Sequence, residues 1–161
     1  MAKEVPSEQD LATSANDAEA FGGVQLARIL SANDDESARQ SAFDCLELWG
    51  TYPDHIEPLY AAARLLHQCG STHLGLMVAE YATTMRARST TGSPWPLSEE
   101  ATGWQMDLLY ARLLVTVGRV SEAMAFFGSV LSSCDPSTRR DVADEVAIAA
   151  RQLELCRVRV V

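Results

Sequence analysis

An internal repeat is the feature of this sequence that most constrains its fold. Residues 59–82 align without gaps with residues 107–130. Both segments contain Ala-Arg-Leu-Leu followed four residues later by a glycine, Gly70 in the first and Gly118 in the second. A unit that recurs in this way predicts similar supersecondary units packed side by side, each burying an apolar face of its neighbour.

Helical periodicity dominates the chain after residue 17, and strand-like alternation never persists. Residues 1–16 are small, polar and acidic, and we expect them to form a flexible acidic segment. The predicted helices cover residues 21–30, 37–49, 56–69, 71–85, 98–117, 121–131 and 136–157. The pattern therefore predicts an all-α fold of about seven helices in antiparallel pairs.

Two of these helices carry more specific expectations. Asp135 is expected to cap the last helix, because Pro136 then occupies a first helical position that suits proline. In the helix over 71–85, the spacing of apolar residues predicts a buried face made of Leu74, Met77, Val78, Tyr81 and Met85.

The stretch 88–97 interrupts the helical pattern. Two prolines, a glycine and four hydroxyl residues cannot sustain a helix interior, so we predict a loop. Trp95 lies in this loop between Pro94 and Pro96. Two interpretations stay open, since an exposed Trp95 would be a docking anchor for a partner, whereas a buried one would pack back onto the helices.

The repeated segments resemble the tetratricopeptide repeat, a helix–turn–helix unit of 34 residues. That family places small residues where its two helices cross, glycine at the turn and proline near the end. The matching positions are Ala63, Gly70, Gly75, Ala79 and Ala82 in one unit, and Ala111, Gly118, Ala123, Phe127 and Asp135-Pro136 in the other. A generic helical bundle with similar spacing is the alternative.

The resemblance implies a right-handed array of antiparallel helix pairs within one domain over residues 17–161. Its repeats would cover about 22–53, 56–87 and 104–135, with the loop 88–97 inserted before the third. A capping helix over 136–157 would close the array.

The same resemblance implies a binding site, because in this family the first helix of each repeat lines a concave groove. The positions carried over are Tyr60, Arg64 and His67 in the second repeat, and Leu108, Arg112 and Val115 in the third. Arg64 and Arg112 occupy equivalent positions of the two repeats, so both guanidinium groups could donate paired hydrogen bonds to acceptors of one ligand. Alternatively, Leu108 and Val115 belong to the core and the arginines pair with acids of the chain.

Composition excludes several classes of partner. The chain has 22 acidic and 13 basic residues and a net charge of −9, which disfavours nucleic acid and anionic membrane surfaces. Lys3 is the only lysine. Tetratricopeptide domains that hold acidic chaperone tails use lysine in the groove, so this sequence favours a partner segment that buries apolar side chains.

No residue pattern predicts an enzyme, a cofactor or a metal site. The sequence lacks a phosphate-binding glycine loop, a nucleophile elbow and a histidine pair with a glutamate on one helix. Adjacent acids such as Glu99-Glu100 are interpreted as helix starts rather than acid–base pairs. The four cysteines are widely spaced, which favours reduced core residues over the alternatives of a disulfide or a zinc site.

These features together predict a protein-binding adaptor or chaperone. Size, acidity and the three-repeat layout are similar to those of bacterial chaperones that hold translocator subunits of type III secretion systems. The alternative is a structural subunit of a larger assembly, and both a homodimer and an obligate complex with another protein stay open. Neither a secretory signal nor a membrane-length apolar run is recognised, so a cytoplasmic location is expected.

Overall fold

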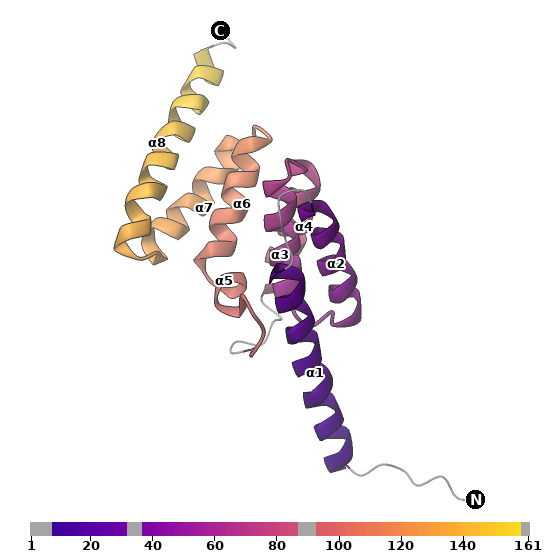
Figure 1. Cartoon of the computed structure of the whole chain (residues 1–161). Coiled ribbons are helices and arrows are strands. Elements are labelled where there is room, and N and C mark those ends of the chain that lie inside the picture. Colours follow the sequence, from indigo (N-terminus) through magenta and orange to yellow (C-terminus); the bar gives the residue numbers. More distant parts are fainter. Residues whose placement is uncertain (1–7, 32–36, 87–92, 159–161) are drawn as a thin grey trace, which may run out of the picture.

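The computed structural model describes residues 8–31, 37–86 and 93–158, and within these ranges the chain forms eight helices and no strand. The all-α prediction is therefore confirmed. The helices, shown in Figure 1, are α1 (Glu8–Ser31), α2 (Ala38–Thr51), α3 (Glu57–Gln68), α4 (Thr72–Met85), α5 (Ser98–Thr102), α6 (Trp104–Thr116), α7 (Val120–Ser133) and α8 (Pro136–Val158).

The helices stack in chain order, so that the molecule is elongated with α1 and α2 at one end and α8 at the other (Figure 1). Packing runs from α2 to α3, from α3 to α4, from α4 to α6, and on through α7 to α8. Two apolar cores result, and α3 contributes to both. Leu59 and Ala63 belong to the core shared with α4, α6 and α7, whereas Ala61 and Leu65 belong to the core shared with α1 and α2.

The sequence repeat corresponds to two matching helix pairs. Helices α4 and α7 both have 14 residues, and each begins two residues after a glycine that ends a turn. Gly70 and Gly118 adopt positive φ angles of 75° and 84°, the left-handed conformation that terminates a helix at little cost only in glycine. The structure is thus repeat-like at the positions that the alignment identified.

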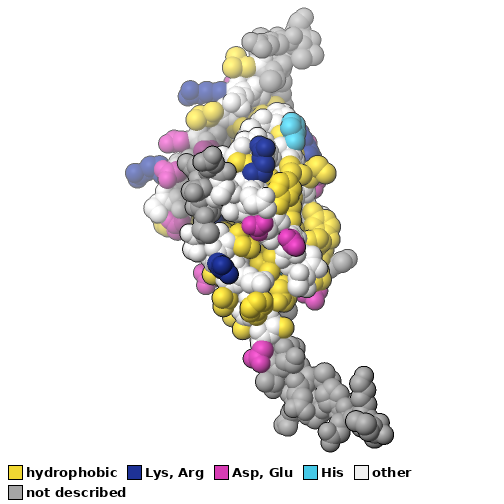
Figure 2. Space-filling model, turned by 45° about the vertical axis from the view of Figure 1, so that its right-hand side comes forward, with side chains coloured by type: hydrophobic (Ala, Val, Ile, Leu, Met, Phe, Trp, Pro, Cys, Tyr) yellow, Lys and Arg dark blue, Asp and Glu magenta, His cyan; other side chains and the backbone are white. Residues whose placement is uncertain are grey.

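Helix α4 turns a different face to the core from the one predicted. Its buried residues are Gly75, Leu76, Ala79 and Ala82, whereas Leu74, Met77 and Tyr81 are exposed. The reason is close helix packing, since a Cβ on Gly75 would lie 3.3 Å from both the Ala63 carbonyl oxygen and the Leu66 Cβ. The larger apolar side chains consequently point outward, on the side of the molecule that carries α2 and α4 (Figure 2).

The helix predicted over 98–117 is in fact two helices, α5 and α6, separated by Gly103. The backbone is extended there, with φ −89° and ψ −167°, and the Gly103 amide still donates to the Glu99 carbonyl at 2.8 Å. A Cβ at this position would lie 2.6 Å from the Glu99 carbonyl oxygen. A side chain would therefore not fit the turn that redirects the chain into α6.

The two terminal helices can be compared with the helix ends predicted from the sequence. Helix α1 begins at Glu8, so it extends into the segment 1–16 that was expected to be flexible; residues 1–7 lie outside the described ranges.

At the C-terminal end of the molecule, Asp135 caps α8 as predicted, because its carboxylate accepts the backbone N–H groups of Ser137 and Thr138, each at 3.0 Å. Hydrogen bonds from the Ser137 and Thr138 hydroxyls, together with these backbone bonds, lower the pKa of Asp135.

The turn glycines generate a first prediction. Gly118→Ala should destabilise the fold by about 1–2 kcal/mol, because an L-residue is strained in the left-handed conformation although nothing lies within 4 Å of the added Cβ. Gly128→Ala, inside α7 and equally open, should instead stabilise it by about 0.5–1 kcal/mol through helix propensity. Urea denaturation of both variants measures the difference, and equal effects would contradict the assigned turn.

Candidate functional site

A pocket of about 270 Å³ lies between α3, α6, α7 and α8, on the side of the helix stack that carries the first helix of each repeated pair. It brings together three of the residues predicted from the sequence, namely His67, Arg112 and Val115. The full lining comprises His67, Arg112, Val115, Thr116, Phe127, Glu145, Ile148 and Ala149.

The floor of the pocket is apolar and its rim is polar. Phe127 and Ala149 are fully buried in the core beneath it, and Val115 is half-buried. Ile148 stands on the rim with 58% of its surface exposed. Such a concavity can take an aliphatic or aromatic side chain of a ligand, with the polar groups fixing its orientation.

An ion pair between Arg112 and Glu145 ties α6 to α8 at the pocket. The guanidinium donates from Nε to Oε2 at 2.9 Å and from Nη2 to Oε1 at 2.5 Å, which makes the pair bidentate. Hydrogen bonding to Glu145 raises the pKa of Arg112. The two carboxylate oxygens occupy donors that were expected to face a ligand, so Arg112 acts here as part of the pocket wall.

Arg64, which occupies the position equivalent to Arg112 in the other repeat, has different contacts. Its guanidinium carbon lies 6.0 Å from the centroid of the Tyr60 ring, and its Nε is buried without a hydrogen-bond partner. No ion pair to Arg64 is present among the described residues. Of the two arginines on equivalent rungs, Arg64 is therefore the one whose charge is not compensated within the part of the chain that the structure describes.

Tyr60 and Leu108 belong to the core rather than to the pocket. Each is only 6% exposed, so little of either side chain is available to a ligand, and Leu108 follows the alternative interpretation as a core residue. The short helix α5 packs on both α3 and α6, and both helices are buried around these residues, over 57–63 in α3 and 106–111 in α6. Burial also raises the pKa of Tyr60, which stays a neutral phenol.

His67 is the histidine among the residues that line the pocket. Its Nδ1 is buried without a hydrogen-bond partner. Burial, followed by the nearby charge of Arg112, lowers the pKa of His67 from its ordinary value of 6.5. The imidazole is consequently neutral at pH 7, and it presents a polar but uncharged edge to whatever enters the pocket.

Trp95 packs back onto the helices and is not an exposed docking anchor. It is 3% exposed and stacks on His55 with ring centroids 4.1 Å apart and an interplanar angle of 9°. On its other side it approaches α1 so closely that a Cβ on Gly22 would lie 2.4 Å from the indole. Residues 93–97 of the predicted loop therefore fasten α1 to the turn between α2 and α3, whereas residues 88–92 lie outside the described ranges.

Helix α8 supplies the residues that the sequence did not identify. Glu145, Ile148 and Ala149 occupy one side of α8, and they complete the pocket opposite α3 and α6. Their spacing of three and four residues was visible as helical periodicity, but a capping helix was expected only to cover the core. Nothing in the local sequence indicated that Glu145 would meet Arg112, which lies 33 residues earlier.

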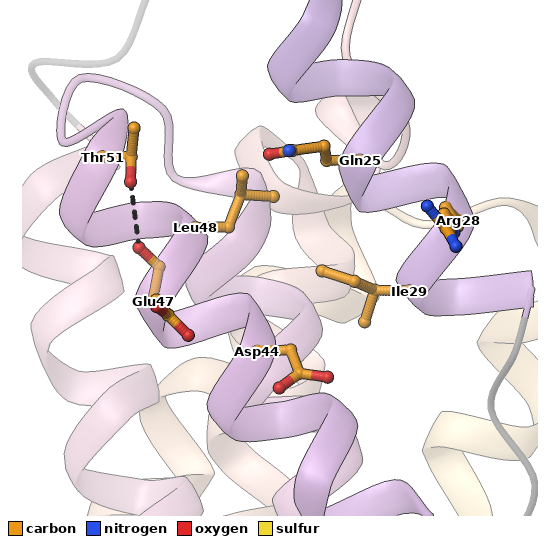
Figure 3. A pocket seen from close by; sticks show the side chains of 7 residues that line it. All are labelled: Gln25, Arg28, Ile29, Asp44, Glu47, Leu48 and Thr51. Atoms are coloured by element: carbon orange, nitrogen blue, oxygen red, sulfur yellow. Dashed lines mark hydrogen bonds between the residues drawn. The ribbon is translucent and has the colours of Figure 1, made fainter.

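A larger pocket of about 520 Å³ lies between α1 and α2. Figure 3 shows Ile29 of α1 and Leu48 of α2 pointing toward each other across it, with Asp44 below them. Arg28 lines the same pocket, yet it forms no ion pair with Asp44 or Glu47 in the described structure. No residue predicted from the sequence lies in this pocket, so the pocket at α8 is the candidate functional site.

The described residues contain no cluster of three or more histidine, cysteine or acidic side chains suited to a metal ion. Cys45, Cys69 and Cys134 are free thiols, and burial raises the pKa of Cys45 to about 12. The side chain of Cys156 lies outside the described part. No helix within the described ranges is long and apolar enough to cross a membrane.

Comparison of the chain with protein-family models, with curated proteins and with solved structures finds no match. Function is therefore inferred from the geometry of this chain alone.

The contact of Trp95 with α1 generates a second prediction. Gly22→Ala should destabilise the protein by about 1–3 kcal/mol, because the added methyl overlaps the indole of a buried residue. Gly23→Ala is the matched control, since its Cβ would lie 3.5 Å from Trp95, and it should be neutral or stabilising through helix propensity. Urea denaturation compares the two variants, and equal stabilities would argue against this placement of the loop.

A third prediction concerns His67. Arg112→Leu removes the neighbouring cation and should raise the pKa of His67 toward 6.5, as measured by an NMR titration of the imidazole. Arg119→Leu, which removes a cation paired with Glu122 instead, should leave that pKa unchanged. Because the pKa is lowered in the folded state, His67 should cost stability as the pH falls below about 6.5. An unchanged pKa of His67 in the Arg112→Leu variant would contradict the influence of the Arg112 charge on this imidazole.

Proposed function

We propose that this chain binds a segment of another protein in the pocket between α3, α6 and α8. One observation carries the proposal: His67 and Val115 occupy equivalent positions of the two aligned segments, and both line one apolar-floored pocket. Surfaces built from equivalent positions of stacked helix pairs are the usual binding surfaces of repeat proteins.

We further propose that the helices form a tetratricopeptide-like array of antiparallel pairs, with α8 as its capping helix. The support is local. Gly70 and Gly118 share a left-handed turn, and the small residues Gly75 and Ala123 are both buried at the crossing of their helix pairs. The right-handed sense of the array is part of the same proposal.

Within this proposal, an apolar side chain of the partner enters the pocket above Phe127 and Ala149. The bidentate pair of Arg112 with Glu145 connects the two walls, while Arg64, which has no ion pair within the described ranges, offers its guanidinium to acceptors of the partner. We propose binding rather than catalysis, because the one carboxylate among the lining residues, Glu145, is engaged by Arg112. The chain would act as an adaptor or a secretion-type chaperone in the cytoplasm.

A pair of substitutions on α8 tests the site. Ile148→Asp places a carboxylate on the pocket rim and should weaken partner capture at least about tenfold, which corresponds to about 1.4 kcal/mol. Leu155→Asp on the same helix is the matched control, since Leu155 is similarly exposed, at 66%, and lies outside the pocket. Affinity purification of each tagged variant from the native cells, followed by quantitative mass spectrometry, measures the capture.

Equal capture by both variants would refute the pocket assignment. Loss of the partners by Leu155→Asp but not by Ile148→Asp would favour the second candidate, a permanent subunit of a larger assembly. That candidate is supported by exposed apolar residues on both end helices, Phe21 and Val24 on α1 and Leu155 on α8. It expects Leu155→Asp to lose the partners and the wild-type chain to aggregate when purified alone.

A further inference from the structure

A second surface of the molecule exposes large apolar side chains. Phe43 of α2 and Leu74, Met77 and Tyr81 of α4 have exposed fractions of 46%, 38%, 67% and 45%. We call these four residues the outer apolar face. Figure 2 shows hydrophobic side chains gathered on the side of the molecule that carries α2 and α4. Scattered exposed hydrophobic residues are ordinary, whereas a group on one face marks a contact surface.

The outer apolar face is continuous between its two helices. Trp49 of α2 meets Tyr81 of α4 edge to face, with ring centroids 5.4 Å apart. Below them, Leu46 of α2 and Val78 of α4 are half-buried and pack against both cores. The exposed side chains therefore stand on a rigid apolar base that belongs to both α2 and α4.

The outer face of α4 can be compared with that of α7, because the two helices occupy equivalent positions in the repeated segments. In the alignment of 59–82 with 107–130, Leu74, Met77 and Tyr81 correspond to Glu122, Ala125 and Ser129. Three buried positions match, Gly75 with Ala123, Ala79 with Phe127 and Ala82 with Val130, and the residues of α7 equivalent to the exposed ones of α4 are exposed as well. A helix in this position thus needs no large apolar side chains on its outer surface, so the fold does not account for those of α4.

We propose that the outer apolar face docks an amphipathic helix of another protein, whose apolar side is flanked by arginine or lysine. This surface is distinct from the pocket at α8, and its occupant would be a second binding segment. Laying a helix against two neighbouring helices lets apolar side chains spaced three and four residues apart contact both.

Charge selects this occupant. Glu47 follows Phe43 by one helical turn on α2, and Glu80 precedes Tyr81 on α4 with 53% of its side chain exposed. The guanidinium of Arg119 lies 3.9 Å from Glu80 but pairs at 2.6 Å with Glu122, and the Tyr110 hydroxyl donates to Glu80 Oε1 at 3.3 Å, so both contacts of Glu80 are long. Arg39 and His73 are confined to the first turns of α2 and α4.

The charge of the whole chain also disfavours a second copy as the occupant. Residues 1–100 contain 15 acidic and 6 basic residues, and each copy carries a net charge of −9. Two such surfaces repel each other, whereas a basic helix is attracted to both carboxylate flanks.

Two designed peptides test the proposal directly. Both are 18-residue amphipathic helices with the same leucine and tryptophan side, and they differ only in whether arginine or glutamate flanks it. The full-length chain should bind the arginine peptide at least about tenfold more tightly than the glutamate peptide in isothermal titration calorimetry at moderate salt.

The variant that combines Leu74→Glu, Met77→Ala and Tyr81→Ser carries the residues of α7 at the equivalent positions, so the helix pair should tolerate it. It should lower the affinity for the arginine peptide at least about tenfold with unchanged helicity. Ile148→Asp should bind that peptide as the wild type does, which separates this face from the pocket at α8. If the triple variant does not fold, Met77→Glu alone, at the most exposed of the four positions, should give the same loss.

Three results would overturn the proposal. Equal affinity for the two peptides, or no binding of either, would refute the choice of a basic helix. Undiminished binding by the triple variant or by Met77→Glu would show that the peptide binds elsewhere. A wild-type dimer in sedimentation equilibrium that the triple variant dissociates would identify a second copy as the occupant instead.

Discussion

The burial of α3 on both sides is the constraint on which the rest of the structure depends. Nine of its twelve residues are buried, and its alanines let α2 approach on one side while α4 and α6 pack on the other. Even Glu57 in its first turn is enclosed, with His55 Nδ1 at 3.6 Å from its carboxylate. Because both cores meet on this helix, the order of the stack and the position of His67 at its exposed end follow from it.

Comparison of the two repeated helix pairs distinguishes the residues that stabilise the fold from the exposed residues that give each surface its chemistry. Turn glycines and small buried residues recur in both pairs, since the backbone geometry and the helix crossings require them. Residues on the open sides diverge, as His67 does from Val115 and Tyr81 from Ser129. One packing solution thereby carries two chemically different surfaces, one around the pocket and one on the outer side of α2 and α4.

Much of the fold was predictable because it depends on local chemistry. Left-handed glycines, the Asp135 cap and the periodic runs identify helices without knowledge of their neighbours. The rest depends on tertiary contacts. Which side of α4 faces the core follows from the approach of Gly75 to Ala63, and the partner of Arg112 is a carboxylate on a distant helix. Of the residues predicted for the site, His67, Arg112 and Val115 line one pocket, whereas Tyr60 and Leu108 are buried where α3, α5 and α6 pack together.

The contact between Gly22 and Trp95 has a consequence for how the protein is made. Trp95 contacts α1 from a segment that follows α4 in the chain. The packing surface for α1 is therefore incomplete until Trp95 has been synthesised. On the ribosome, α2, α3 and α4 can assemble as they emerge, whereas α1 has to remain loosely attached until residue 95 leaves the exit tunnel. The time needed to translate the chain through Trp95 and then to move Trp95 out of the tunnel therefore sets how long the earliest helix is accessible to chaperones and proteases.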